Sequence, residues 1–355
     1  MAEWMLYGAN GYTGALIARE ATKRGMPPVL AGRNAQVVNQ LGKELGCATR
    51  SFSLTDPEAI VQHLHGVRLV LLCAGPFSAT SQPMLEACKR AATHYLDITG
   101  EIPVLESLFR QAPSLAQAGI VALPGVGFDV VPTDCLAAML KRELPDATSL
   151  RLVFASEQGL VSRGTMLTSL ESVGEPTKMR KDGKIIDVAG VSVMLPFGDR
   201  PAPALRLSWG DVSTAYYSTG IPTIETFIGT PALVKRLQQI TRWERVLAWG
   251  PMRSVAKGFY GRTLTGPTEA QRAQDDTIVW GEVSNRAGRK VAMKLRTPAA
   301  YSLTVDAAVT AVARMLDGNL EPGAYTPSLA FGPEFVLGLR GVEGPLVASA
   351  SASDA

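Results

Sequence analysis

Short apolar runs alternate with helix-like segments over the first 125 residues of the chain. The apolar runs predict strands near 3–8, 28–32, 48–53, 68–73, 94–98 and 119–123. Between them, apolar positions at helical spacing predict helices near 13–24, 35–45, 57–65, 79–92 and 103–117. Such alternation is typical of a doubly wound parallel sheet with helices on both faces, so we predict an α/β domain over 1–130.

The pattern changes after about residue 148. Alternating apolar positions predict strands at 149–156, 185–195, 204–210, 213–219, 277–284 and 289–296, the last two joined by a hairpin turn at 285–288. Helical patterns cover 132–143, 231–249 and 303–316. We therefore predict a second α+β domain over 131–300 with a mixed, largely antiparallel sheet. Residues 301–345 should return to pack on the first domain, and 346–355 should form a disordered tail.

Composition narrows the class of protein. The 355 residues are 46% hydrophobic and 19% charged, which is typical of a globular protein, and no stretch of 18 apolar residues could span a membrane. A strand is predicted almost at the N-terminus, so we expect no signal peptide. Four cysteines without paired spacing favour a reducing, cytoplasmic location. Three histidines without ligand spacing predict no metal site and give little support to a Ser/His/Asp hydrolase.

Positive charge is concentrated in the middle of the chain. Residues 151–300 hold 21 Lys and Arg against 13 Asp and Glu, whereas the whole chain has a net charge of +3. This region is either an attractive surface for an anionic substrate or a solvated face. It lacks the dense basic clusters with interleaved aromatics that indicate nucleic-acid binding, so we expect no nucleic acid. The apolar tract 246–252 fits a substrate tunnel, peripheral contact with lipid, or core and dimer packing.

Three glycines follow the first predicted strand and open the first predicted helix. Their spacing is GxxGxxG, which differs from the more common GxGxxG of dinucleotide-binding loops. Glycines let the backbone turn tightly and approach a phosphate, and the helix N-terminus supplies N–H donors to it. The residues expected to hold a pyrophosphate are Gly8, Asn10, Gly11, Tyr12, Thr13 and Gly14.

The end of the second predicted strand indicates which dinucleotide binds. NAD enzymes usually carry an acidic residue here that bonds the ribose 2′-hydroxyl, but this chain has Gly32, Arg33 and Asn34. A guanidinium suits a 2′-phosphate, and a charge-assisted contact of about 1.5–3 kcal/mol changes affinity tenfold or more. The alternative is a solvent-exposed arginine at a helix start. We predict NADP(H) rather than NAD(H).

Three further loops end predicted strands at the same edge of the sheet, where ligands bind in open α/β folds. They are 74–77, 94–101 and 124–134. Within the last, Asp134 is expected to cap the helix that follows. The small residues of the first of these loops, Ala74, Gly75, Pro76 and Phe77, would permit close approach to the ribose-nicotinamide half of the cofactor; the alternative is an ordinary strand-to-helix turn.

Together these loops resemble those of the saccharopine dehydrogenase-like oxidoreductases, in particular the trans-acting enoyl reductase branch. The matching segments are GANGYTG at 8–14, LAGRN at 30–34, AGPF at 74–77, HYLDITGE at 94–101, GVGFDVVPTD at 125–134 and YTPSLAFGPEFVLGL at 325–339. The resemblance implies an N-terminal Rossmann domain that binds NADP(H), a sheet-rich second domain and a homodimer. It also implies that the loops over 74–77, 99–101 and 127–129 border the nicotinamide, which adds Thr99, Gly100, Gly127 and Phe128 to the expected cofactor-binding residues.

The resemblance also implies the chemistry. The first hypothesis is an NADPH-dependent reductase of a conjugated C=C bond in a small, lipid-like or polyketide-like substrate, with Asp129 and Tyr95 as candidate catalytic groups and Tyr216 and Tyr217 as weaker ones. A second is C=N reduction or amine oxidation on an amino-acid-like substrate. Its candidate carboxylate binders are Arg163 and Arg206. A third is a non-catalytic NADP-binding sensor or scaffold.

Overall fold

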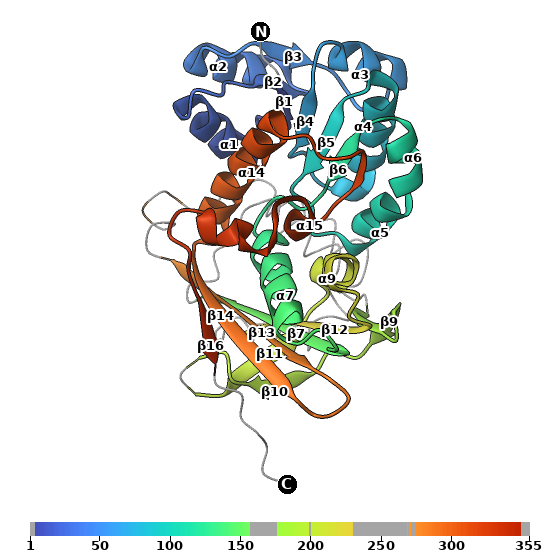
Figure 1. The fold of residues 1–355 in the computed structure, drawn as a ribbon. Helices are drawn as coiled ribbons and strands as arrows, with labels where there is room; N and C mark the ends of the chain where they lie inside the picture. Colours follow the sequence, from blue (N-terminus) through green and yellow to red (C-terminus); the bar gives the residue numbers. More distant parts are fainter. Residues whose placement is uncertain are drawn as a thin grey trace, which may run out of the picture. The chain divides into compact units, whose positions relative to one another are not determined.

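A computed structural model describes residues 4–156, 176–198, 200–229, 268, 270 and 275–348 of the chain (Figure 1). The chain divides into two compact units. Unit 1 comprises residues 1–131 and 301–340, and unit 2 comprises residues 132–300 and 341–355.

Unit 1 contains a parallel sheet in the order β15-β6-β5-β4-β1-β2-β3 (Figure 1). Its strands are β1 (Trp4–Tyr7), β2 (Val29–Gly32), β3 (Thr49–Ser51), β4 (Leu69–Leu72), β5 (His94–Asp97), β6 (Val121–Leu123) and β15 (Gly323–Ala324). On one side of the β1–β4 pair the sheet continues with β2 and β3, and on the other side it continues with β5, β6 and β15. In open α/β sheets this reversal of strand order marks the crevice in which a ligand binds.

Helices connect these strands, as predicted for a doubly wound fold. They are α1 (Tyr12–Lys23), α2 (Ala35–Leu45), α3 (Pro57–Leu64), α4 (Phe77–Ala91), α5 (Ile102–Arg110) and α6 (Ala112–Gln117). The predicted single helix over 103–117 is wrong, since it divides at Gln111. Pro113 lies in the first turn of α6, where its missing N–H is tolerated, whereas a continuous helix would lose a hydrogen bond there.

The apolar core of unit 1 surrounds the central strands. All four residues of β4 are fully buried, which explains the continuous apolar run in its sequence. Apolar side chains from the helices, including Ile60, Met84 and Leu108, pack against the sheet. A rigid sheet therefore supports the loops that follow β1, β2, β4, β5 and β6.

The C-terminal segment completes unit 1. It consists of α14 (Ala300–Asp317), β15, α15 (Pro327–Phe331) and a 3-10 helix, η1 (Pro333–Gly338). Asp306 of α14 forms ion pairs with Arg24 and with Arg340, and it also accepts a hydrogen bond from the Arg340 backbone N–H at 2.7 Å. Arg24 and Arg340 both pair with Glu20 of α1. These contacts hold α14 and the residues after η1 against α1.

Unit 2 contains a mixed, largely antiparallel sheet, as predicted, in the order β10-β11-β12-β7-β13-β14-β16 with β8 and β9 paired off it. Its strands are β7 (Ser149–Ser156), β8 (Thr177–Lys181), β9 (Lys184–Val188), β10 (Ser192–Leu195), β11 (Ala202–Arg206), β12 (Thr223–Ile228), β13 (Asp276–Ser284), β14 (Lys290–Pro298) and β16 (Glu343–Ala348). The helices of unit 2 that the described residues include are α7 (Val131–Glu143) and α9 (Asp211–Thr219). Leu136 and Leu140 of α7 pack over Gly281 of β13 on one face of the sheet. A second core, with Val153, Phe227 and Trp280, lies on the opposite face.

Several predictions for unit 2 are wrong. The predicted strand over 213–219 is helix α9, because Gly210 and Gly220 bound it and its buried positions recur at helical spacing. The predicted strand over 185–195 is two strands, β9 and β10, and β12 was not predicted. Residues 346–348, expected to begin a disordered tail, belong to β16, which pairs with β14.

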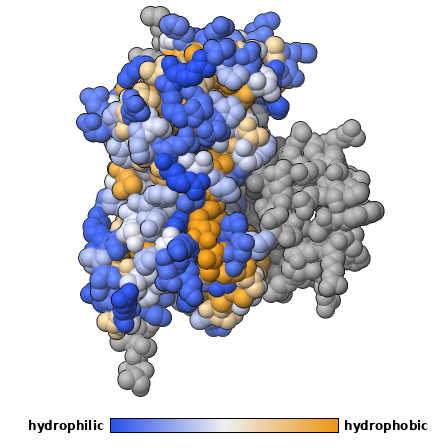
Figure 2. All heavy atoms as spheres, turned by 90° about the vertical axis from the view of Figure 1, so that its right-hand side faces the viewer, coloured by the Kyte–Doolittle hydropathy of each residue, from blue (hydrophilic) through white to orange (hydrophobic). Residues whose placement is uncertain are grey.

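Other predictions fall on residues outside the described ranges: the helix over 231–249, the apolar tract 246–252 and Arg163. Within those ranges, no helix combines the length and the apolar character that a membrane crossing requires. Hydrophilic residues cover most of the face seen in Figure 2, where apolar residues gather in one strip. Few large apolar side chains are exposed among the described residues; they are Val37, Ile186, Met194, Leu329 and Leu346.

Candidate functional site

The first loop of unit 1 crosses very close to two neighbouring backbone segments. Gly8 has a φ of 87°, and a Cβ there would lie 2.7 Å from the backbone N of Ala74, which follows β4. A Cβ on Gly14 would lie 2.3 Å from the carbonyl oxygen of Gly8. Only glycine fits at either position, since no larger residue could avoid these backbone atoms. The glycines thus bring the start of α1 against the end of β1, the arrangement that a pyrophosphate-binding turn requires.

The N-terminus of α1 differs from those of the next three helices. Gly11 is its N-cap and brings no side chain, and the first turn contains no acidic residue. Asn34 caps α2 by accepting a hydrogen bond from the Val37 N–H, and Asp56 caps α3. A carboxylate from elsewhere in unit 1, that of Glu101, caps α4. The N-cap and the first turn of α1 thus supply no carboxylate or amide oxygen of their own, which suits an anionic ligand at the positive end of the helix dipole.

Arg33 lies exposed immediately after β2, as its predicted role requires. A Cβ on Gly32 would lie 2.8 Å from the side-chain oxygen of Asn10, so the first loop extends over the end of β2. The charge of Arg33 also reaches Tyr7, since it lowers the pKa of that phenol while burial, the larger effect, raises it. Gly32, Arg33 and Asn10 are thus brought together, whereas Asn34 has a structural role as the α2 cap.

The loop after β4 is held by a residue that the sequence analysis did not select. The carboxylate of Glu101 accepts hydrogen bonds from the backbone N–H groups of Phe77 and Ser78, at 2.7 and 2.8 Å. Glu101 lies 24 residues from Phe77 in the sequence. Its position directly after Thr99-Gly100, in a loop already assigned to the same sheet edge, was the one signal of this role. The contact joins the loop over 74–77 to the loop after β5.

Asp97, the last residue of β5, is fully buried and joins two loops. Its Oδ1 atom accepts hydrogen bonds from the backbone N–H groups of Thr99 and Gly125, both at 2.9 Å. Its Oδ2 atom accepts one from the hydroxyl of Tyr95 at 2.6 Å. Burial raises the pKa of Asp97 to about 6, and the charge of Glu101 adds to this, although the three hydrogen bonds oppose it.

Tyr95 is placed where it supports the loops rather than where it could meet a substrate. Its side chain is fully buried in the core of unit 1, and its hydroxyl donates to Asp97. Burial, followed by the charge of Asp97, raises the pKa of this phenol well above its usual value. The geometry therefore corrects the assignment of Tyr95 as a catalytic group.

Asp129 lies in the loop between β6 and α7 and remains partly exposed. Its carboxylate packs against Gly100, where a Cβ would lie 3.0 Å from the Oδ2 atom. Burial raises the pKa of Asp129 to about 6. Among the described residues, this carboxylate forms no hydrogen bond or ion pair. It is thus free to exchange a proton at a pH close to neutral, as a general acid or base must.

The C-terminal helix α14 supports two of these loops, a contribution with no local sequence signal. The hydroxyl of Thr304 accepts a hydrogen bond from the Phe128 N–H at 3.0 Å, and a Cβ on Gly127 would lie 3.1 Å from the Thr304 methyl group. The rings of Tyr301 and Tyr12 meet edge to face, with their centroids 5.1 Å apart. Gly127, Phe128 and Tyr12 are therefore positioned by α14. Asp134 lies inside the first turn of α7 and is not its N-cap.

The remaining candidates lie in unit 2. Arg206 is engaged by Glu225 and by the carbonyl oxygen of Ala189, so it is not available to bind a substrate carboxylate. The guanidinium carbon of Arg180 lies 4.1 Å from the centroid of the Tyr216 ring. The rings of Tyr216 and Tyr217 meet edge to face. Both tyrosines therefore have packing roles within unit 2.

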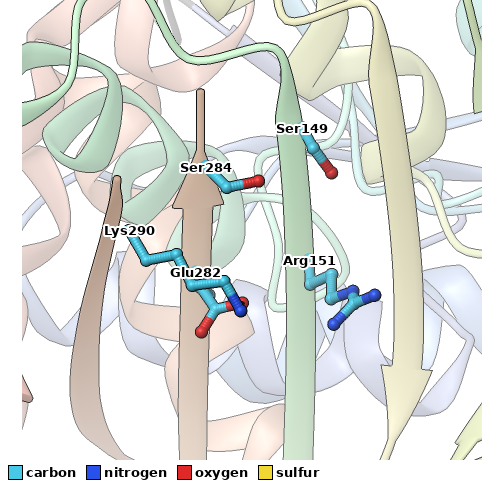
Figure 3. A pocket seen from close by; sticks show the side chains of 5 residues that line it. All are labelled: Ser149, Arg151, Glu282, Ser284 and Lys290. Carbon is cyan, nitrogen blue, oxygen red and sulfur yellow. The ribbon is translucent and has the colours of Figure 1, made fainter. Parts of the chain in front are cut away.

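A small polar pocket lies on the sheet of unit 2, at β7, β13 and β14 (Figure 3), and its volume is about 100 Å³. It is lined by Ser149, Arg151, Glu282, Ser284 and Lys290. The Lys290 side chain runs toward the carboxylate of Glu282, 3.8 Å away, and Arg151 pairs with Glu225 at 3.4 Å. At these positions carboxylates compensate the positive charge of the basic middle region.

Comparisons with known proteins agree with the geometry of unit 1. Residues 8–105 match the NAD(P)H-binding family, which supports a nicotinamide cofactor. Within the described residues, no group of three or more His, Cys, Asp or Glu side chains is placed to hold a metal ion.

The chain is 26% identical over 216 residues to a saccharopine dehydrogenase-like oxidoreductase from Rattus norvegicus, covering 54% of this chain and 50% of that protein. It is 27% identical over 185 residues to a trans-acting enoyl reductase from Mycobacterium ulcerans, covering 48% and 44%. The resemblance predicted from the loops is confirmed. The chain spans about half the length of the curated relatives it matches.

Among solved structures, the fold is similar to that of saccharopine dehydrogenase (L-Glu forming) from Saccharomyces cerevisiae. The TM-score is 0.60 at 14% sequence identity, and the match covers 94% of this chain and 95% of that one. At this identity the likeness concerns the fold, and it supports a Rossmann-type unit joined to a second unit with a mixed sheet.

Proposed function

We propose that this protein is an NADPH-dependent oxidoreductase that reduces a conjugated C=C bond. The observation that carries the proposal is the arrangement at one edge of the unit 1 sheet. Gly8 and Gly14 form a tight turn before a helix whose N-cap is a glycine, and Arg33 lies exposed after the next strand. Asp129, on a later loop, has a carboxyl group with no hydrogen-bond or ion-pair partner among the described residues.

The cofactor fits the residues of this edge. The backbone of 8–14 would bind the pyrophosphate, because the close approach of Gly8 and Gly14 leaves backbone N–H groups rather than side chains at the turn. Arg33 would pair with the 2′-phosphate of the adenosine ribose. The loops over 74–77, 99–101 and 127–129 would border the nicotinamide. The match of residues 8–105 to the NAD(P)H-binding family supports a nicotinamide cofactor at this edge.

The chemistry at the nicotinamide end needs one group from the protein. When bound, the cofactor supplies a hydride to the β-carbon of the conjugated substrate. A proton must then reach the α-carbon. Asp129 is the candidate donor, because burial raises the pKa of its carboxyl to about 6 and a proton is therefore available near neutral pH.

An assay of NADPH consumption tests the proposal against its alternatives. We expect oxidation of NADPH with members of a panel of α,β-unsaturated thioesters and ketones. Consumption with imines of amino acids alone would instead indicate C=N reduction. Binding of NADPH without turnover of any member would favour a sensor or scaffold. A folded protein that binds neither NADPH nor NADPH analogues would contradict the proposal at its first step.

A further inference from the structure

We infer that Asp97 is a positioning residue that holds the loops over 98–101 and 124–130 in one arrangement and so sets the place of Asp129. The structural part of this inference concerns unit 1 alone. Its consequence for catalysis rests on the proposed function.

The hydrogen bonds of Asp97 reach both loops from one point. Its Oδ1 atom accepts from Thr99 in one loop and from Gly125 in the other. The carbonyl oxygen of Asp97 also accepts a hydrogen bond from the Val126 N–H at 2.8 Å. The start of the loop over 124–130 is therefore bound to Asp97 by its side chain and by its backbone.

The chemistry of the site explains why a carboxylate is used. Asp97 is fully buried and forms no ion pair with any described cation, so its charge depends on N–H and O–H donors. A carboxylate has two oxygens that can accept the three bonds from Thr99, Gly125 and Tyr95. An asparagine offers one oxygen and could keep only part of this set.

The loops that Asp97 binds also contact Asp129 and its neighbour Val130. Gly100 follows Thr99 and packs against the Asp129 carboxylate. On the other side, a Cβ on Gly125 would lie 2.6 Å from the Val130 side chain and 3.3 Å from the Thr99 carbonyl oxygen. The two loops are in contact on both sides of Asp129, so releasing Thr99 and Gly125 from Asp97 should let Asp129 move relative to Gly100.

Four variants test the inference. Asp97→Ala removes all three side-chain bonds, Asp97→Asn keeps part of them, and Tyr95→Phe removes only the bond to Oδ2. Asp56→Asn is the matched control, because the Asp56 carboxylate also accepts two backbone hydrogen bonds, at 3.0 and 3.2 Å, but caps α3. Hydrogen exchange, followed by mass spectrometry of peptides covering 98–101 and 124–130, is measured on each folded variant without cofactor. The NADPH Kd and kcat are measured alongside.

In Asp97→Ala we expect exchange of both peptides to rise about tenfold or more, since each lost bond to a charged acceptor is worth about that factor. With an active substrate, kcat should fall at least about tenfold while the NADPH Kd changes less than about threefold. Asp97→Asn should show smaller changes in exchange and in kcat than Asp97→Ala. Tyr95→Phe should also change them less than Asp97→Ala does. Asp56→Asn should leave the exchange of both peptides unchanged. If Asp97→Ala does not fold, the same exchange measurements on Asp97→Asn and Tyr95→Phe test the inference.

Unchanged exchange in the two peptides of Asp97→Asn and Asp97→Ala would overturn the inference. So would faster exchange in one peptide without the other. Because these measurements need no cofactor, they are independent of the proposed function. If wild-type protein fails to bind NADPH but the exchange result holds, the proposed function fails and the structural role of Asp97 stands.

Discussion

The carboxylate of Asp129 lies directly over Gly100, so closely that a Cβ at Gly100 would be 3.0 Å from both the Cβ and the Oδ2 atom of Asp129. A side chain at position 100 therefore cannot be added without moving the carboxyl group that we propose as the proton donor.

We expect Gly100→Ala to lower kcat by about threefold to tenfold, because the Asp129 side chain must move by a few tenths of an ångström and a displacement near 1 Å of a reacting group costs up to about a hundredfold. The NADPH Kd should change less than kcat, since the 8–14 loop that would bind the pyrophosphate is untouched. Gly338→Ala is the control, because a Cβ at Gly338 meets no atom within 4 Å. Steady-state kinetics and NADPH fluorescence titration measure both quantities. Equal kcat in the two variants would contradict the placement of Asp129 at the reacting centre.

Arg33 should decide the choice of cofactor. Replacing it with Ala removes a charge-assisted contact, so we expect the NADPH Kd to rise about tenfold or more while the NADH Kd stays within about threefold. Arg110, exposed on α5, provides the matched Arg→Ala control. An unchanged ratio of the two dissociation constants in Arg33→Ala would show that the 2′-phosphate is bound elsewhere.

The raised pKa of Asp129 predicts how stability depends on pH. In the unfolded chain this carboxyl has a pKa near its ordinary value of 3.8, whereas in the folded protein burial raises it to about 6. Between these values the folded state keeps a proton that the unfolded state has lost, so the free energy of unfolding falls as pH rises. Asp129→Asn has no charge to bury. We expect it to be more stable than wild type by about 1–3 kcal/mol at pH 8 and similar at pH 4, as measured by urea unfolding.

The same titration should govern turnover. A protonated Asp129 is needed for proton donation, so kcat should fall as pH rises through about 6, and Asp129→Asn should lose this dependence along with most of the activity. Asp97 has a raised pKa of about the same value. Its variant Asp97→Asn therefore separates the two groups, since it should keep a pH profile set by Asp129. A profile that survives in Asp129→Asn would assign the proton to another group.

Asp306 should be the residue on which attachment of α14 most depends. It is nearly buried between Arg24 and Arg340, so Asp306→Ala leaves two guanidinium groups without this partner. We expect the free energy of unfolding to fall by about 2–4 kcal/mol. Glu44→Ala, which breaks an exposed pair with Arg19, should cost less than about 1 kcal/mol. Similar losses in the two variants would contradict a special role for Asp306.

Unit 1 follows its sequence closely because local pattern and tertiary burial agree there. The run over 69–72 is apolar at every position, and all four residues are buried inside a parallel sheet. Unit 2 follows its sequence less closely. Tyr216, Tyr217 and Thr219 favour a strand by propensity, yet α9 forms because Val212, Ala215 and Thr219 pack at helical spacing.

The sequence alone predicted four features of unit 1: its parallel sheet, the glycine turn, the position of Arg33 at the end of β2 and the position of Asp129 in the loop after β6. Each has a local signal: an apolar run, a glycine spacing, or a charge at a strand end. Only the tertiary structure decided that Tyr95 supports rather than reacts, that Glu101 caps α4, and that Thr304 binds Phe128 from 176 residues away. The contacts of Glu101 and Thr304 satisfy backbone N–H groups with acceptors distant in the chain, and no local pattern specifies which acceptor the folded backbone will bring within reach.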